Sequence, residues 1–119
     1  MLCAKEYQPR SSEFPGLKLV LHAPMSDDDD PDNFDVAMPA AESVVREWRR
    51  GRTILITCML GRNRSALVAT LALFFLTGIP IRDLVDHIRS LRRDPMGGTP
   101  LTNPAFISFL SAIGYSRTA

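Results

Sequence analysis

The hydrophobic pattern of the chain predicts both strands and helices. Two short apolar runs, Leu17 to His22 and Thr53 to Thr57, are bracketed by turn residues or lie close to glycine and proline. The second run, with the sequence TILIT, is apolar and rich in β-branched residues, which is typical of a central strand with both faces covered. We therefore expect two buried strands, the second of them in the middle of a sheet.

Four longer segments carry the hydrophobic period of helices. Their predicted bounds are Val36 to Arg50, Ser65 to Thr77, Ile81 to Arg93 and Pro104 to Gly114. Asp35 and Asn103 are the expected N-caps of the first and last helix, and Gly51 and Gly78 are expected to end the first and second. The second helix is apolar nearly all round, so it should be the most buried of the four.

The order of these elements indicates the fold class. Strand, loop, helix, strand, tight loop and three helices together predict an α/β fold, a small three-layer sandwich with a mostly parallel central sheet flanked by helices. At 119 residues the chain has room for one domain, residues 1–119, because typical domains hold about 100 to 150 residues. The apolar content of 45% is that of an ordinary globular protein.

Several classes of protein are excluded by the sequence. The longest nearly uncharged apolar run, Ser65 to Pro80, is shorter than the roughly 18 residues that a membrane span needs. The first residues lack the pattern of a secretory signal, and two cysteines, Cys3 and Cys58, are too few for a disulfide framework. We expect a cytoplasmic protein in a reducing compartment, without membrane association.

The charges are unevenly distributed along the chain. Residues 1–35 hold eight acids and three bases, and residues 36–119 hold five acids and eleven bases, all of them arginine. The rigid fork of arginine suits phosphate and carboxylate groups, which indicates an anionic ligand. Basic runs with interleaved aromatic residues are missing, so nucleic acid is not the expected partner.

The segment with the clearest chemistry lies between the second strand and the second helix. Its sequence, from Cys58 to Ser65, is CMLGRNRS. A cysteine at a helix N-terminus meets the positive end of the helix dipole, unpaired backbone N–H groups and the nearby Arg64. Such surroundings lower the pKa of a cysteine to about 3.5 to 7.5. Cys58 is therefore the candidate nucleophile.

The same loop is suited to bind a tetrahedral dianion. Its backbone N–H groups can surround the anion while Arg64 donates two parallel hydrogen bonds to it. Gly61 would allow the tight turn, and Ser65 would stabilise the Cys58 thiolate when it leaves. This chemistry is phosphoryl transfer to sulfur. The predicted phosphate-binding residues are Met59, Leu60, Gly61, Arg62, Asn63 and Arg64.

At these residues the sequence resembles a known family. Cys58-x5-Arg64-Ser65 resembles the CX5R signature loop of the cysteine-dependent protein tyrosine phosphatases, and Asn103-Pro104-x-Phe106 resembles the end of their dual-specificity branch. The resemblance covers nearly the whole chain. It implies a phosphocysteine intermediate at Cys58, phosphate binding by Arg64, and an aspartate on a separate loop that protonates the leaving oxygen.

The identity of the acid is left open by the sequence. The stretch from Ala23 to Asp35 is predicted to be a loop, and it contains the run Asp27 to Asp30. Family members place the aspartate shortly after a proline that closes a strand, so the resemblance favours Asp27, which follows Pro24, and puts Asp28 second. Neighbouring carboxylates would raise the pKa of an aspartate in this run and so favour its protonated form, but this effect does not distinguish among the four aspartates.

Two features depart from the family pattern. Thr57 occupies the position before the cysteine, where the family usually has histidine; we expect its hydroxyl to bond to the loop. The segment from Leu2 to Glu6 resembles the end of a strand in the middle of the family's sheet, so the usual first strands are lacking. Either the domain is a minimal version or a second copy covers the open sheet edge, which makes a homodimer a hypothesis.

The predicted function is that of a metal-independent phosphatase that hydrolyses phosphomonoesters of proteins, on tyrosine or with dual specificity. We expect no cofactor and no metal, because His22 and His87 have no ligand partners at suitable spacing. The alternatives are a pseudophosphatase, which binds phosphorylated partners without turnover, and a rhodanese-like sulfurtransferase. Cys3 is either a core cysteine or, by the resemblance, a redox partner of Cys58.

Overall fold

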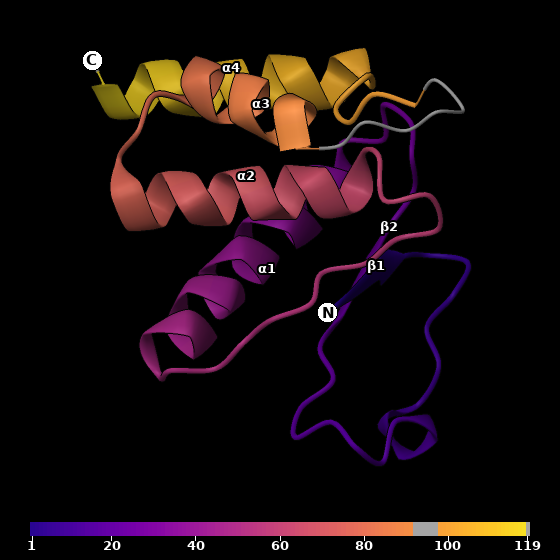
Figure 1. Ribbon diagram of the computed structural model, residues 1–119. Coiled ribbons are helices and arrows are strands. Elements are labelled where there is room, and N and C mark those ends of the chain that lie inside the picture. The colour runs from indigo at the N-terminus through magenta and orange to yellow at the C-terminus, as the bar shows by residue number, and fades with distance from the viewer. Residues whose placement is uncertain (92–97, 119) are drawn as a thin grey trace.

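The computed structural model of the protein shows a mixed α/β fold (Figure 1). The structure describes residues 1–91 and 98–118. The described elements are, in chain order, β1 (Leu2–Ala4), the 3-10 helix η1 (Ser11–Glu13), β2 (His22–Met25), α1 (Asp32–Arg49), α2 (Arg64–Thr77), α3 (Ile81–Leu91) and α4 (Pro104–Thr118). The expected α/β class is confirmed at this level, with a two-stranded parallel sheet and four helices among the described residues.

The strand β1 has a hydrogen-bonded neighbour on each side. It pairs in parallel with β2, with Leu2 opposite His22. On its other side, the N–H of Thr57 donates to the carbonyl of Met1 over 3.0 Å, and the N–H of Cys3 donates to the carbonyl of Thr57 over 2.8 Å. The N-terminal segment therefore lies in the middle of the strand arrangement, as the sequence predicted for it.

Both strand predictions were wrong in their detail. Of the predicted strand Leu17 to His22, only His22 belongs to β2, which continues to Met25 through Pro24. Proline is tolerated there because β2 bonds to β1 alone among the described strands, so its missing N–H interrupts no second ladder. Because proline is unusual inside a strand, the sequence pattern predicted a strand that ends before Pro24, whereas β2 continues across it.

The segment from Thr53 to Thr57 is not a regular strand. It contributes an isolated parallel bridge between Leu2 and Thr57. Its alternate residues face two environments: Ile54 and Ile56 pack against the core, whereas Leu55 is 74% exposed. The prediction of a central strand covered on both faces is therefore corrected to an edge segment covered on one.

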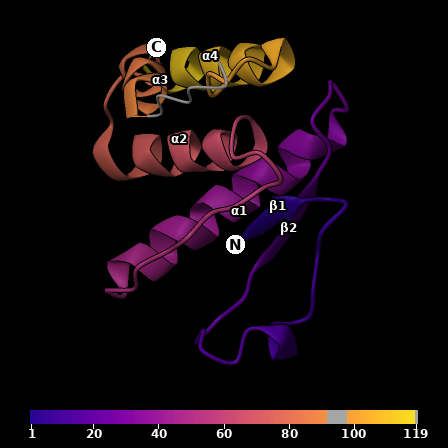
Figure 2. The same cartoon turned by 45° about the vertical axis from the view of Figure 1, so that its right-hand side comes forward.

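The helices form two layers: α1 and α2 contact the strands, and α3 and α4 lie on the far side of α2. The helix α1 packs against β2 and crosses α2, and α2 also contacts β1. The helices α3 and α4 pack on α2, away from the strands, as Figures 1 and 2 show from two directions. None of the described helices combines the length and the apolar character that crossing a membrane requires.

The helix α1 begins earlier than predicted. Its N-cap is Pro31, so the expected cap Asp35 lies within the first turn of the helix. The N–H of Asp32 donates to the side chain of Asp30 over 3.0 Å just before the helix. The predicted loop from Ala23 to Asp35 thus shrinks to the residues between β2 and α1. The helix ends as predicted, just before Gly51, which has a φ of 81°. Trp48, in the last turn, is 57% exposed.

The remaining helices follow the predicted pattern closely. The helix α2 is mostly buried and ends at Gly78, whose φ is 69°. The predicted end of α3 at Arg93 lies outside the described residues. The helix α4 has the predicted cap, because the side chain of Asn103 accepts from the N–H of Ala105 over 3.0 Å. It continues past Gly114, where the absence of a side chain allows close packing on α3.

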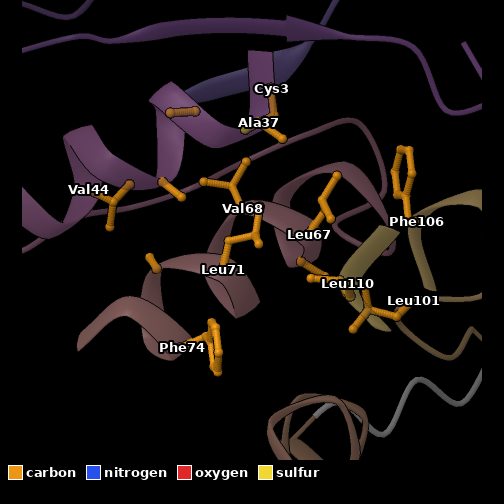
Figure 3. Close-up of a cluster of buried hydrophobic side chains, with 14 of the residues drawn as sticks. Cys3, Ala37, Val44, Leu67, Val68, Leu71, Phe74, Leu101, Phe106 and Leu110 are labelled. Carbon is orange, nitrogen blue, oxygen red and sulfur yellow. The ribbon is translucent and has the colours of Figure 1, made fainter. Parts of the chain in front are cut away.

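The hydrophobic core is formed by residues from both strands and from all four described helices, and Figure 3 shows part of it. Leu67, Leu71 and Phe106 are fully buried in it. The rings of Phe34 and Phe109 stack with their centroids 4.2 Å apart, which joins the start of α1 to α4. This packing fixes the N-terminus of α2, where the signature loop ends, next to the strands.

Candidate active site

The thiol of Cys58 lies at the start of α2 with two hydrogen-bond partners. Its Sγ is 3.2 Å from the hydroxyl oxygen of Ser65, and the backbone N–H of Gly61 donates to the same sulfur over 3.2 Å. Gly61 has a φ of 65°, a left-handed conformation that favours glycine. The structure therefore brings together Cys58, Gly61 and Ser65, which the sequence assigned to one loop.

The electrostatics of this site favour the thiolate of Cys58. Burial raises the pKa of the thiol, but hydrogen bonds from the Ser65 hydroxyl and from the backbone N–H groups of Ser65 and Gly61, together with the charge of Arg64, outweigh it. The pKa of Cys58 thus lies below its ordinary value of 9.0. A lowered pKa increases the fraction of the nucleophilic form at neutral pH.

The guanidinium of Arg64 is held from one side. The side chain of Arg64, which is the first residue of α2, is only 8% exposed. Its Nη1 donates to both carboxylate oxygens of Glu6, to Oε2 over 3.0 Å, and to the carbonyl of Met25 over 3.1 Å. All hydrogen bonds of this guanidinium to other described residues leave from Nη1. The Nε and Nη2 edge is therefore not used by these partners.

The other residues of the predicted phosphate loop have different surroundings. Met59 and Leu60 have exposed side chains. The side chain of Arg62 covers Gly98, where an added Cβ would lie 2.3 Å from the guanidinium Nε, and its carbonyl accepts from the N–H of Leu101 over 2.7 Å. Arg62 is thus part of the packing between the loop and the segment before α4.

Asp27 is joined to the signature loop. The amide of Asn63 donates to its Oδ2 over 2.9 Å, and the amide of Asn103 donates to its Oδ1 over 2.9 Å. Asp27 is exposed, and each of its carboxylate oxygens accepts one of these two amide bonds. Asp27 is thus bonded to the loop that carries Cys58 and to the residue that caps α4.

Asp28 has a different role from Asp27. Its Oδ1 accepts from the hydroxyl of Ser26 over 2.7 Å, from the N–H of Asp30 over 3.0 Å and from the amide of Asn33 over 3.2 Å. The hydrogen bond from Ser26 is the main cause that lowers the pKa of Asp28 below its ordinary value of 3.8. Asp28 therefore shapes the turn before α1 as a carboxylate, which is a poor starting point for a proton donor.

Asn63, which the sequence placed in the phosphate-binding loop, has long-range side-chain contacts that the sequence did not indicate. Its side chain is buried and links three segments. While its amide donates to Asp27, its Oδ1 accepts from the N–H groups of Thr102 and Asn103 over 2.8 and 3.0 Å. No signal in the local sequence gives these partners, because they lie about forty residues away.

Cys3 is fully buried beside the site. Its N–H bonds to the carbonyl of Thr57, and burial, followed by the charge of Cys58, raises the pKa of Cys3 to about 12. The two cysteines are free thiols. The hydroxyl of Thr57 donates to the carbonyl of Met1 over 3.4 Å, so the expected bond from this hydroxyl to the signature loop is replaced by a weak one to the strand region.

Among residues 1–91 and 98–118, no three His, Cys, Asp or Glu side chains gather into a group that could hold a metal ion. Comparisons with families of known proteins, with curated proteins and with solved structures found no match for this chain. The function is therefore argued from the site itself.

Proposed function

We propose that this protein is a metal-independent phosphomonoester hydrolase, a protein tyrosine or dual-specificity phosphatase that acts through phosphocysteine at Cys58. The observation that carries the proposal is the position of Cys58 Sγ, which shares the N–H of Gly61 and the hydroxyl of Ser65 at the start of α2. Such a thiolate, beside an arginine and at the N-terminus of a helix, favours attack on a tetrahedral dianion.

The first step transfers the phosphoryl group to sulfur. The Cys58 thiolate attacks phosphorus, the S–P bond forms, and the bond to the leaving oxygen breaks. Arg64, held on its Nη1 side by Glu6, would donate from Nε and Nη2 to two phosphate oxygens. Asp27, in its protonated form, gives its proton to the leaving oxygen, so an alcohol departs.

The second step restores the enzyme. Water attacks phosphorus while the Asp27 carboxylate takes its proton, and the S–P bond breaks with both electrons returning to sulfur. The hydroxyl of Ser65, 3.2 Å from Cys58 Sγ, stabilises the departing thiolate. Inorganic phosphate is released, and Asp27 is again protonated for the next cycle.

The proposal includes the fold family and location that the sequence suggested. The chain would belong to the dual-specificity branch of the cysteine-dependent phosphatases, with residues 1–119 forming a small three-layer sandwich. Two free cysteines, Cys3 and Cys58, agree with a reducing cytoplasm. The substrate would be a phosphorylated protein.

A second copy of the chain is proposed to cover the open edge of the strands. Among the described residues, the backbone groups of Ile54 and Ile56 make no hydrogen bond to another residue, and Leu55 is exposed beside them. An unpaired edge of this kind is a template for another strand. Sedimentation should show a dimer at micromolar concentration that Leu55→Lys dissociates; a monomeric parent would contradict this.

The function is tested by phosphate release from aryl phosphates in EDTA and dithiothreitol. The parent should be active and Cys58→Ser inactive on p-nitrophenyl phosphate. On phenyl phosphate, whose leaving group needs a proton, Asp27→Ala should lose about 10²- to 10⁴-fold and Asp28→Ala much less. Acid quenching of the parent during turnover should trap phosphorus on the tryptic peptide that contains Cys58.

Other outcomes would identify the alternatives. A folded parent that binds a phosphotyrosine peptide but releases no phosphate would indicate a pseudophosphatase. Transfer of sulfur from thiosulfate to Cys58, without phosphate release, would indicate a rhodanese-like sulfurtransferase. Activity that survives in Cys58→Ser would contradict the thiol mechanism outright.

A further inference from the structure

The three asparagines of the chain converge on one short segment, Ser26 to Asp28, which we name the acid loop. Each of them donates side-chain amide hydrogens to it. Asn33, from α1, donates to the carbonyl of Ser26 over 2.8 Å. Asn63, from the signature loop, and Asn103, from the cap of α4, each donate to Asp27. The acid loop is thus held from three elements that are far apart in the sequence.

Asn63 and Asn103 hold the two oxygens of the same carboxyl group. Asn63 takes Oδ2 and Asn103 takes Oδ1, both over 2.9 Å, and Asn103 also donates to the carbonyl of Asp28 over 3.1 Å. Each carboxyl oxygen has two lone pairs, so one on each side remains for a proton or a leaving group. The two bonds fix the plane of the carboxyl without using up its capacity for proton transfer.

The donors are themselves fixed. The side-chain oxygen of Asn63 accepts from the N–H of Thr102 and of Asn103, and that of Asn103 accepts from Ala105. Leu101, just before them, has a φ of 61° and is fully buried. A non-glycine residue in this conformation costs free energy and persists where surrounding contacts determine it.

We propose that Asn63 and Asn103 are positioning residues that hold Asp27 against the signature loop before substrate binds. The inference rests on the proposed phosphatase function and deepens it, because it makes the acid loop closed in the free enzyme. Proton transfer then depends on two side-chain amides that act through their bonds to Asp27. Removing either amide should displace the Asp27 carboxyl while leaving Cys58 and Arg64 in place.

Two substitutions remove the amide donors and keep the acceptors. Asn63→Asp retains the oxygen that faces Thr102 and Asn103, and Asn103→Ser retains an oxygen that can cap α4. Neither variant changes the nucleophile or the arginine. Ser111→Asp, on the exposed face of α4, serves as the control for an added negative charge.

The readout is the dependence of rate on the leaving group. On phenyl phosphate, each variant should lose on the order of 10²-fold in kcat, because a misplaced proton donor cannot assist a poor leaving group. On 2,4-dinitrophenyl phosphate, whose leaving group needs no proton, Asn103→Ser should stay near the parent. In an Asp27→Ala background Asn103→Ser should cause no further loss. Equal losses of Asn103→Ser on both substrates, or a loss that multiplies with that of Asp27→Ala, would overturn the inference.

A second measurement does not depend on activity. In Asp27→Ala the side-chain amide resonances of Asn63 and Asn103 should both shift relative to the parent, because each amide loses its acceptor. An active parent whose amides ignore Asp27 would overturn the positioning role and leave the phosphatase function intact. An inactive parent whose amides follow Asp27 would do the reverse, because the contacts would stand without the chemistry.

Discussion

Glu6 and Arg64 are 58 residues apart in the chain and form an ion pair at the end of β1. The carboxylate is largely exposed, whereas the guanidinium is buried. Because the pair uses Nη1 alone, Glu6 orients the arginine and leaves its other edge for an anion. Glu6 thus belongs to the site although it was absent from the residues that the sequence singled out.

Replacing Arg64 tests the anion-binding edge. Arg64→Lys should lower kcat/KM for p-nitrophenyl phosphate by on the order of 10²- to 10³-fold, because a point charge cannot donate two parallel hydrogen bonds. Glu6→Gln should cause a smaller loss, mainly by raising KM for p-nitrophenyl phosphate, since it loosens the guanidinium without removing it. The kinetics of both variants on one substrate check this order; a larger effect of Glu6→Gln than of Arg64→Lys would contradict it.

Removing the Ser65 hydroxyl should raise the pKa of Cys58. In the parent, that hydroxyl and two backbone N–H groups hold the pKa below its ordinary value of 9.0. The pH dependence of Cys58 alkylation by iodoacetamide should therefore move to higher pH in Ser65→Ala and stay unchanged in Ser111→Ala. Cys3, whose pKa is raised to about 12, should remain unmodified in the folded protein.

The same shift has a consequence for stability. Folding lowers the pKa of Cys58, so the thiolate contributes stability that is fully present above the unfolded value and is lost as the pH falls through the folded value. The free energy of unfolding of the parent relative to Cys58→Ser should therefore rise with pH through that window. A difference that does not change with pH would indicate an unperturbed thiol.

Two glycines allow strain to be separated from function. Gly61 and Gly51 have φ values of 65° and 81°, and an added Cβ at Gly51 meets no atom within 4 Å. Alanine at either position should cost about 1 to 2 kcal/mol in the free energy of unfolding through backbone strain, which at Gly51 is the whole effect. Gly61→Ala should also slow alkylation of Cys58 at neutral pH, because relaxation of the strained backbone turns the N–H of residue 61 away from the sulfur; Gly51→Ala should not.

Asp28 should act on stability and not on proton transfer. Its pKa is lowered, so its carboxylate contributes stability that is present above the unfolded value near 3.8 and is lost as the pH falls through the folded value. Asp28→Asn should lower the urea midpoint at neutral pH, and the difference from the parent should vanish in acid. A variant that matches the parent at neutral pH would show that the turn does not need the charge.

Local patterns in the sequence predicted the nucleophile's surroundings well. Cys58, Gly61 and Ser65 lie within one strand-to-helix turn, so their mutual contacts follow from the spacing alone. The helix stops at Gly51 and Gly78 were equally local, because each needs only a residue that tolerates a positive φ.

The contacts that distinguish Asp27 from the neighbouring aspartates could not be predicted from such local patterns. Asp27 is distinguished from its three neighbours by amides that lie 36 and 76 residues away. The strand predictions were wrong for a related reason. Whether Leu55 is covered, and whether Pro24 fits in β2, depends on which segments lie beside them in the sheet. The apolar pattern of one segment does not specify those neighbours.

The long reach of Asn103 has a consequence for how the protein is made. Because it bonds to Asp27 across 76 residues, the acid loop cannot gain the last of its three asparagine contacts until synthesis has passed the start of α4. Contacts of this sequence separation form late, after the costly closure of a long chain segment. The nucleophile's turn can assemble earlier from neighbouring residues, so a nascent chain would hold a formed thiolate loop before it holds an acid, and chemistry would begin only once the last helix has docked.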